Sequence, residues 1–191
     1  MTPAEQFAPL LIRLLEAIVD NPQKVKIDSL EFEGGVAWSF SCEAGDIRKV
    51  IGKEGSRLRA IRLVVDLAGN QAREEWRFFA PKTDDRAGSI GFVPAQVPKN
   101  HTPVADVLLL SDLLGSVGIR ATVSPQGSLN AGYSFRIHPD TVADQTALLE
   151  MHPALYGDQT ETKPINLIGA LGPIFRAIAG RKAVKYRLDV V

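Results

Sequence analysis

The sequence predicts an α+β protein made of two similar domains, each with a small three-stranded sheet packed by helices. Three observations support this prediction. Apolar residues recur at helical spacing in some segments, as from Phe7 to Ile18, and alternate with polar residues in others, as from Val36 to Cys42. A glycine-rich turn, Gly52-Lys53-Glu54-Gly55, lies between two of the expected helices. A similar turn recurs late in the chain.

Composition limits the classes of function that we consider. Of the 191 residues, 45% are hydrophobic and 23% are charged, and the formal net charge is zero. This balance is typical of a soluble globule and argues against a protein that coats DNA, because the domains of such proteins are usually basic. The single Cys42 excludes an internal disulfide and fits a reducing compartment. We recognise neither a signal peptide nor a bilayer-spanning segment, so we expect a cytoplasmic protein without a membrane partner.

The start of the chain predicts a helix followed by two strands. Thr2, Pro3 and Glu5 are typical of a helix start, although Pro9 suggests that the regular helix begins only near that residue. Two alternating segments after this helix are joined by Gly34-Gly35, a pair typical of a hairpin turn.

Residues 52–55, which we call the glycine loop, separate two further expected helices. The first runs from about residue 46 to 51. Ser56 is a suitable cap for the second, and Gly69-Asn70 is expected to end it. A strand around Trp76 follows, so the predicted order is helix, strand, strand, helix, loop, helix, strand.

The glycine loop has the features of a clamp for the phosphates of a single-stranded nucleic acid. Glycine lets a ligand approach the backbone closely, since no Cβ stands in the way. A helix that starts at Ser56 would direct free N–H groups and the positive end of its dipole into the loop. Six basic residues and one acid, Glu54, lie between Ile47 and Arg62. Two close glycines are also compatible with helices that simply pack tightly, so the loop alone does not decide the function.

This half of the chain resembles the KH domain in its prokaryotic, type II arrangement, and especially the small bacterial RNA-binding proteins with a single KH domain. The resemblance covers roughly residues 7 to 80. It rests on three segments: Val50-Ile51-Gly52-Lys53-Glu54-Gly55, Arg59-Ala60-Ile61-Arg62, and the lead-in Ala17-Ile18-Val19-Asp20-Asn21-Pro22. KH domains bind about four unpaired nucleotides of RNA or DNA in a narrow groove beside the loop.

The resemblance implies a set of RNA-binding residues on this chain. The backbone contact would come from the glycine loop, that is from Gly52, Lys53, Glu54 and Gly55. The neighbouring candidates are Arg48, Lys49 and Arg57 for phosphates, Ile51 for bases, and Ser56 at the start of the helix. Ile51 could equally be an ordinary core residue, and Glu54 should weaken phosphate binding because it carries a like charge.

The second half of the sequence repeats the first. Residues 168–178 align without gaps on residues 51–61, and six of the eleven positions are identical. A helical apolar pattern precedes this segment near residues 104–114, and strands are expected at 119–123, 132–135 and 184–190. We therefore predict a KH domain in residues 1–80, a linker in 81–101, and a second, degenerate KH-like domain in 102–191 with an insertion at 139–163.

The predicted second loop differs from the first in its chemistry. It consists of Gly169, Ala170, Leu171 and Gly172, followed by Arg176, and it has no polar side chain between its glycines. Basic residues nearby could still attract phosphate. Alternatively, Leu171 turns the loop into an apolar contact for the first domain or for another chain, and we favour this interpretation. The insertion could cover a groove, bind a partner or form a simple loop.

The sequence shows no constellation for catalysis. His101, His138 and His152 are widely spaced and lack the paired spacing of a metal site, and no nucleophile with a neighbouring base is evident. We expect no enzyme, no metal and no cofactor. The favoured function is non-catalytic binding of single-stranded RNA. The alternatives are a scaffold that assembles with another RNA-binding protein or the ribosome, as a homo- or heterodimer, and a binder of single-stranded DNA.

Overall fold

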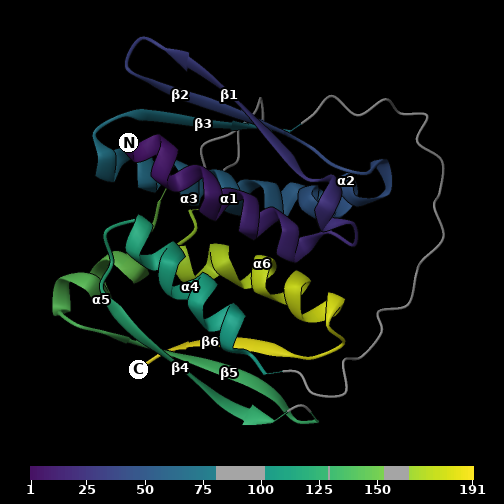
Figure 1. Cartoon of the computed structure of the whole chain (residues 1–191). Coiled ribbons are helices and arrows are strands. Elements are labelled where there is room, and N and C mark those ends of the chain that lie inside the picture. The colour runs from purple at the N-terminus through teal and green to yellow at the C-terminus, as the bar shows by residue number, and fades with distance from the viewer. Residues whose placement is uncertain (81–101, 129, 153–163) are drawn as a thin grey trace.

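Two three-stranded sheets form the outer layers of the structure, and helices α1, α3, α4 and α6 lie between them (Figure 1). The computed structural model describes residues 1–80, 102–128, 130–152 and 164–191. The predicted α+β class with two small sheets is confirmed. The expected linker, residues 81–101, lies outside the described residues.

The first half has the predicted order of elements. Its sheet has the order β1-β2-β3, with β1 antiparallel to β2 and β2 parallel to β3. The elements are α1 (Pro3–Ile18), β1 (Lys26–Phe32), β2 (Gly35–Ser41), α2 (Ala44–Ile51), α3 (Ser56–Ala72) and β3 (Glu75–Phe79), with short 3-10 turns at Pro22–Lys24 and Lys53–Gly55.

The second half repeats this topology. Its sheet has the order β4-β5-β6, again with an antiparallel pair followed by a parallel pair. Pro125 is tolerated in this sheet because β4 is an edge strand. The elements are α4 (Val104–Ser116), β4 (Ala121–Ser128), β5 (Gly132–Pro139), α5 (Val142–Leu149), α6 (Leu167–Arg181) and β6 (Tyr186–Val190).

The start of α1 confirms one prediction and corrects another. The Thr2 hydroxyl accepts the N–H of Glu5, and the Glu5 carboxylate accepts the N–H of Thr2, which completes a capping box. The helix then passes through Pro9 without a break, so the expected late start is wrong. Buried side chains on both sides of the proline, such as Phe7 and Leu11, hold the helix against the core and outweigh the one lost hydrogen bond.

The end of α3 also differs from the expectation. The helix continues past Gly69-Asn70 to Ala72, and Arg73 ends it with a φ of 61°. Gly69 serves packing instead, because a Cβ there would come within 2.8 Å of the Cβ of Trp76. The glycine therefore lets β3 lie close against α3.

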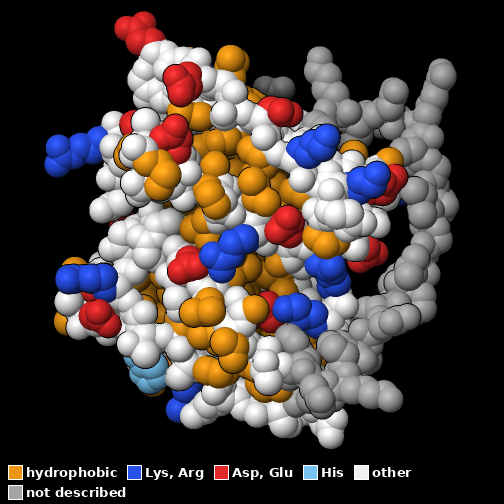
Figure 2. Space-filling model, viewed as in Figure 1, with side chains coloured by type: hydrophobic (Ala, Val, Ile, Leu, Met, Phe, Trp, Pro, Cys, Tyr) orange, Lys and Arg blue, Asp and Glu red, His pale blue; other side chains and the backbone are white. Residues whose placement is uncertain are grey.

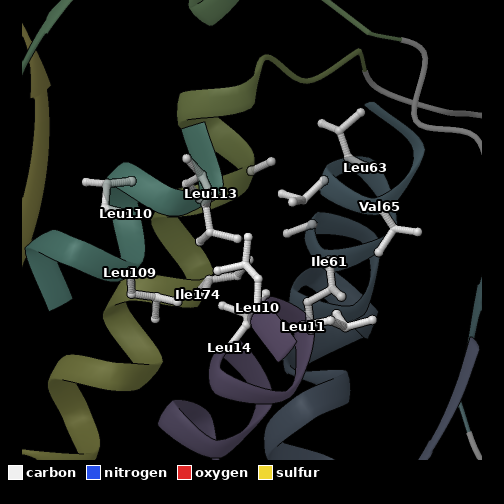
Figure 3. Close-up of a cluster of buried hydrophobic side chains, with 14 of the residues drawn as sticks. Leu10, Leu11, Leu14, Ile61, Leu63, Val65, Leu109, Leu110, Leu113 and Ile174 are labelled. Carbon is white, nitrogen blue, oxygen red and sulfur yellow. The ribbon is translucent and has the colours of Figure 1, made fainter. Parts of the chain in front are cut away.

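The two halves share one hydrophobic core. Side chains of α1, α3, α4 and α6 meet between the sheets, as the close-up of Leu11, Ile61, Leu113 and Ile174 shows (Figure 3). The α3–α6 contact is supplemented by the α1–α4 contact, where Arg13 and Asp112 form an exposed ion pair at 2.8 Å. The halves are therefore packed together through their helices.

The predicted second loop, Gly169-Ala170-Leu171-Gly172, is not a loop. These residues form the beginning of α6, and Ala170 and Leu171 are fully buried. The helix starts at Leu167, where the side chain of Asn166 accepts the N–H of Gly169 at 2.7 Å. Neither glycine has a positive φ, so nothing in this segment turns the chain away from the helix.

The gap-free alignment that suggested this loop is two helical turns out of register. Arg73 and Ala183 both follow their helix with a positive φ and lie 110 residues apart, as do Trp76 and Tyr186 in the equivalent strands. The alignment instead joined residues 117 apart. Because seven residues are almost two turns of a helix, the apolar pattern fits in either register.

The predicted insertion at 139–163 also needs correction. Its first part forms α5, which occupies the place of α2 in the repeat. The extra residues therefore follow Leu149, and 153–163 lie outside the described residues. Where the first half has the four-residue glycine loop, the second half has the 17 residues from Glu150 to Asn166.

Candidate nucleic-acid interface

The glycine loop is a tight turn that needs unusual backbone angles. Gly52, Glu54 and Gly55 have φ values of 77°, 53° and 73°. At Gly52 a Cβ would also lie 2.8 Å from the Cγ of Arg57. For Glu54, as for any non-glycine residue, the left-handed conformation costs roughly 1–2 kcal/mol. Both glycines are thus required by the shape of the turn.

Among the described residues, two backbone donors at the tip of the loop have no partner. The N–H of Gly52 donates to the carbonyl of Arg48 at 2.9 Å, and the N–H of Gly55 donates to that of Gly52 at 3.2 Å. In the part of the chain that the structure describes, the N–H groups of Lys53 and Glu54 have no acceptor. Their side chains are 91% and 80% exposed. The loop therefore presents two free donors to solvent.

Two arginines of α3 hold the loop in place through hydrogen bonds to backbone carbonyls. Arg57 donates through Nη1 to the carbonyl of Lys49 at 2.5 Å, and Arg59 donates to that of Glu54 at 2.6 Å. Burial lowers the pKa of Arg57, and the nearby charge of Arg176 lowers it further. Arg59 has a positioning role that the sequence did not indicate, since it reaches back five residues from an exposed face of the helix.

The other two basic candidates differ in their surroundings. Arg48 is exposed on α2. Lys49 is paired with the carboxylates of Asp20 and Asp46, the second at 3.3 Å, so its charge is already partly balanced. Arg48 is thus the freer of the two cations for a phosphate.

The buried carboxylate of Asp46 joins α2 to the end of α1. It accepts the backbone N–H groups of Asp20 at 3.0 Å and Asn21 at 2.9 Å, and the side-chain amide of Asn21 at 3.1 Å. Burial raises the pKa of Asp46, but these hydrogen bonds and that from Lys49 outweigh it, so the pKa lies below its ordinary value. Asp46 thereby positions the helix that leads into the glycine loop.

In the second half, an aspartate of the equivalent short helix makes the same kind of connection. Asp144 of α5 accepts the N–H of Arg120 at 2.9 Å, just after α4 ends. The hydroxyl of Thr141 lowers the pKa of Asp144, and the N–H of Arg120 lowers it as well. Sequence reasoning missed both carboxylates, although each is the third residue of a short helix.

The remaining predicted site residues lie at the base of the loop. Ile51 is half-buried and packs against the core, so the core interpretation fits its position. Ser56 is the first residue of α3, and the cap position that was expected for it is occupied by Gly55. Gly55 can do this because its left-handed conformation turns the chain directly into the helix.

Two further features bear on function. A hollow of about 400 Å³ lies at the second sheet, beside Gly127, Tyr133 and Tyr186, and not at the glycine loop. Each described helix is too short or too polar for a bilayer crossing.

Comparison with known proteins assigns the first half to a family. The family model described as "KhpA/KhpB, KH domain" matches residues 9–78. The RNA-binding protein KhpA of Bacillus subtilis is 32% identical over 69 residues, which are 36% of this chain and 85% of that relative. The chain belongs to the KhpA/KhpB KH-domain family.

Other KhpA proteins match with similar identity and coverage. The RNA-binding protein KhpA of Chlamydia trachomatis is 34% identical over 59 residues, 30% of this chain and 76% of that relative. The RNA-binding protein KhpA of Streptomyces coelicolor is 36% identical over 61 residues, 32% and 77% respectively. The family model, residues 9–78, falls within the first half, which runs from α1 to β3. Topology alone relates the second half to it.

Proposed function

We propose that this protein binds single-stranded RNA, without catalysis, through the glycine loop of its KH domain. The observation that carries the proposal is the pair of N–H groups at Lys53 and Glu54, which find no acceptor in the described part of the chain and lie on a turn whose glycines leave the backbone bare. Such donors suit the oxygens of a phosphate. The KhpA relatives are named RNA-binding proteins, which agrees with this proposal.

Each neighbouring residue has a role in this proposal. Arg48 and Arg57 add charge for the phosphates next to the loop, while Ile51 packs against the core with one part and presents its exposed part to the bases. Few phosphates are touched, so the affinity of one KH domain is modest and falls as salt rises. Sequence preference comes from base edges, as in other KH domains.

The loop is tested by replacing both of its central residues with aspartate, Lys53→Asp and Glu54→Asp. We expect the fold to persist and binding of a fluorescein-labelled RNA oligomer, followed by anisotropy, to weaken at least tenfold. Arg136→Asp, on the exposed face of β5, is the matched control because it changes the net charge equally. Unchanged RNA binding by the loop variant would reject the proposal.

The second half enters the proposal as a degenerate KH-like domain, residues 102–191. Its support is the repeated strand order and directions. An RNA-binding loop is not part of it, because Gly169–Gly172 are helical.

The scaffold alternative loses one of its supports. It relied on an exposed apolar loop at Leu171, which instead is buried within this chain. A pull-down of another RNA-binding protein or of ribosomes that survives nuclease treatment would still favour it. Competition between RNA and DNA oligomers of the same sequence distinguishes the two nucleic acids.

A further inference from the structure

One face of the first sheet carries no helix. In Figure 1 the helices lie against one side of β1, β2 and β3, and no described element lies over the other side, which we call the outer face. Residues that are directly opposite in neighbouring strands point to the same side of a sheet. The strand register therefore gives the outer face three rows, which are Phe32-Gly35-Glu75, Leu30-Ala37-Arg77 and Asp28-Ser39-Phe79.

Apolar side chains are exposed at both edges of the outer face. Leu30 on β1 is 70% exposed, and Phe79 on β3 is 48% exposed. Phe32 on β1 is partly exposed, and its ring centroid lies 5.0 Å from the guanidinium carbon of Arg77. The central strand contributes only small side chains between these edges, those of Gly35, Ala37 and Ser39. Another element could therefore lie close to β2, between the larger side chains of β1 and β3.

The equivalent face of the second sheet is polar. Gly35 and Gly132 each begin the middle strand and each end the hairpin ladder, so the two sheets can be compared row by row. The places of Leu30, Phe32 and Phe79 are taken in the second sheet by Gln126, Ser128 and Asp189. The fold therefore does not require an apolar outer face. Since exposed apolar patches are typical of interaction sites, we infer that the first sheet uses this face to bind another molecule.

Charges around the outer face favour a basic partner. On β1, on the turn after it and on β3, four exposed acids outnumber two exposed cations; the acids are Asp28, Glu31, Glu33 and Glu75, and the cations are Lys26 and Arg77. Arg77 is moreover paired with Glu75. This balance repels the phosphates of RNA and of anionic lipids, whereas it attracts a cationic segment of a protein.

The dimensions of the outer face match those of a single helix. Three strands of about seven residues make a face roughly 14 Å wide and 20 Å long. An α-helix of about 13 residues is 20 Å long and 10–12 Å across, so it would cover this face. A second copy of this chain fits less well, because a stable dimer buries about 800 Å² on each partner and this face offers roughly 300 Å².

We propose that the outer face of the first sheet, with Leu30, Ala37 and Phe79 at its centre, docks a basic amphipathic helix of a partner protein. The apolar side of the helix lies over β2, between Leu30 and Phe79. Its lysines and arginines lie against the acids of β1 and of the turn that follows. The face includes no residue of the glycine loop, so this docking is independent of the proposed binding of RNA.

The test uses a synthetic helical peptide of about 14 residues, built from leucine and lysine with leucine at every third or fourth position. It is added to the 15N-labelled protein, and binding is followed by NMR. The amides of Leu30, Ala37 and Phe79 should shift and reach saturation, whereas those of Gln126 and Asp189 should stay in place. A peptide of the same composition without the apolar stripe, and one with glutamate in place of lysine, should each bind at least fivefold more weakly.

Variants of the protein show whether the apolar side chains carry the contact. Leu30→Ser and Phe79→Ser should each weaken peptide binding at least fivefold, with the melting temperature unchanged because both side chains are exposed. Val142→Ser, at a 79% exposed position on α5, is the control and should bind as the wild type does.

Three results would overturn the docking site. The first is a peptide that leaves the amides of the outer face unshifted. The second is a loss of RNA affinity in Phe79→Ser, because RNA would then occupy the face. The third is a dimer in sedimentation that Leu30→Ser dissociates, because a second copy would then occupy it. Each of these results leaves the aspartate variant of the glycine loop as a separate test of the proposed function.

Discussion

Asp46 illustrates at the scale of single residues how a buried group positions an exposed site. Its carboxylate fastens α2 to the end of α1 through three hydrogen bonds, and α2 leads into the glycine loop. At other equivalent positions the two halves use different kinds of side chain. Where Phe7 contacts Trp76 in the first half, Asp106 accepts the hydroxyl of Tyr186 at 2.5 Å and pairs with Lys182. A hydrophobic pattern does not predict such a difference, because it indicates only which face of a helix is buried.

Replacement of Asp46 by asparagine should lower the free energy of unfolding by about 2 kcal/mol at neutral pH, because two buried N–H groups lose a charged acceptor. The pKa of Asp46 in the folded protein lies below the ordinary 3.8, so its contribution is complete above that pH and disappears as the pH falls through the folded value. Urea unfolding of both proteins at pH 7 and near pH 2 measures this. A difference that stays constant with pH would contradict the assignment.

The element on which the proposed function depends is the turn between α2 and α3, and its sequence was sufficient to predict the turn. Glycines at 52 and 55 with polar residues between them indicate a turn with a bare backbone. The same spacing at Gly169 and Gly172 gave a wrong prediction, because Ala170 and Leu171 favour a buried helix. Spacing of glycines alone therefore does not distinguish a loop from a helix, whereas the polarity of the residues between them does.

Gly52→Ala should destabilise the protein by roughly 1–3 kcal/mol, because alanine is strained at a φ of 77° and its Cβ would lie 2.8 Å from the Cγ of Arg57. Gly115→Ala is the matched control. This glycine is in α4, and an added Cβ meets nothing within 4 Å. The control should be neutral or up to about 1 kcal/mol more stable. Chemical denaturation measures both, and equal effects would show that the turn is not strained.

The whole molecule is organised by the contact between the helix layers. Amphipathic patterns predicted which helices have an apolar face but not which faces meet, since any apolar stripe can cover any other. The sequence therefore indicated two tandem domains, and the structure adds that they bury their helices against each other. Figure 2 shows hydrophobic side chains running from one half of the molecule into the other across this face.

Because the core is shared, we expect a destabilising substitution in one half to lower the stability of the other half as well. Both tryptophans, Trp38 and Trp76, lie in the first half and report its unfolding by fluorescence. Leu171→Ala, in the second half, should lower the stability measured by this signal by about 2–5 kcal/mol, since Leu171 is fully buried. Leu30→Ala, at a 70% exposed position, is the control. A tryptophan transition unaffected by Leu171→Ala would show that the halves unfold independently.

NMR of the 15N-labelled protein during titration with a short single-stranded RNA shows whether the backbone of the glycine loop holds the strand. We expect the amides of Lys53 and Glu54, which have no acceptor among the described residues, to shift most and in proportion to saturation. Their neighbours in α2 and in the first turn of α3 should follow. If saturating RNA leaves the signals of these two amides unshifted while others shift, the glycine loop does not hold the strand.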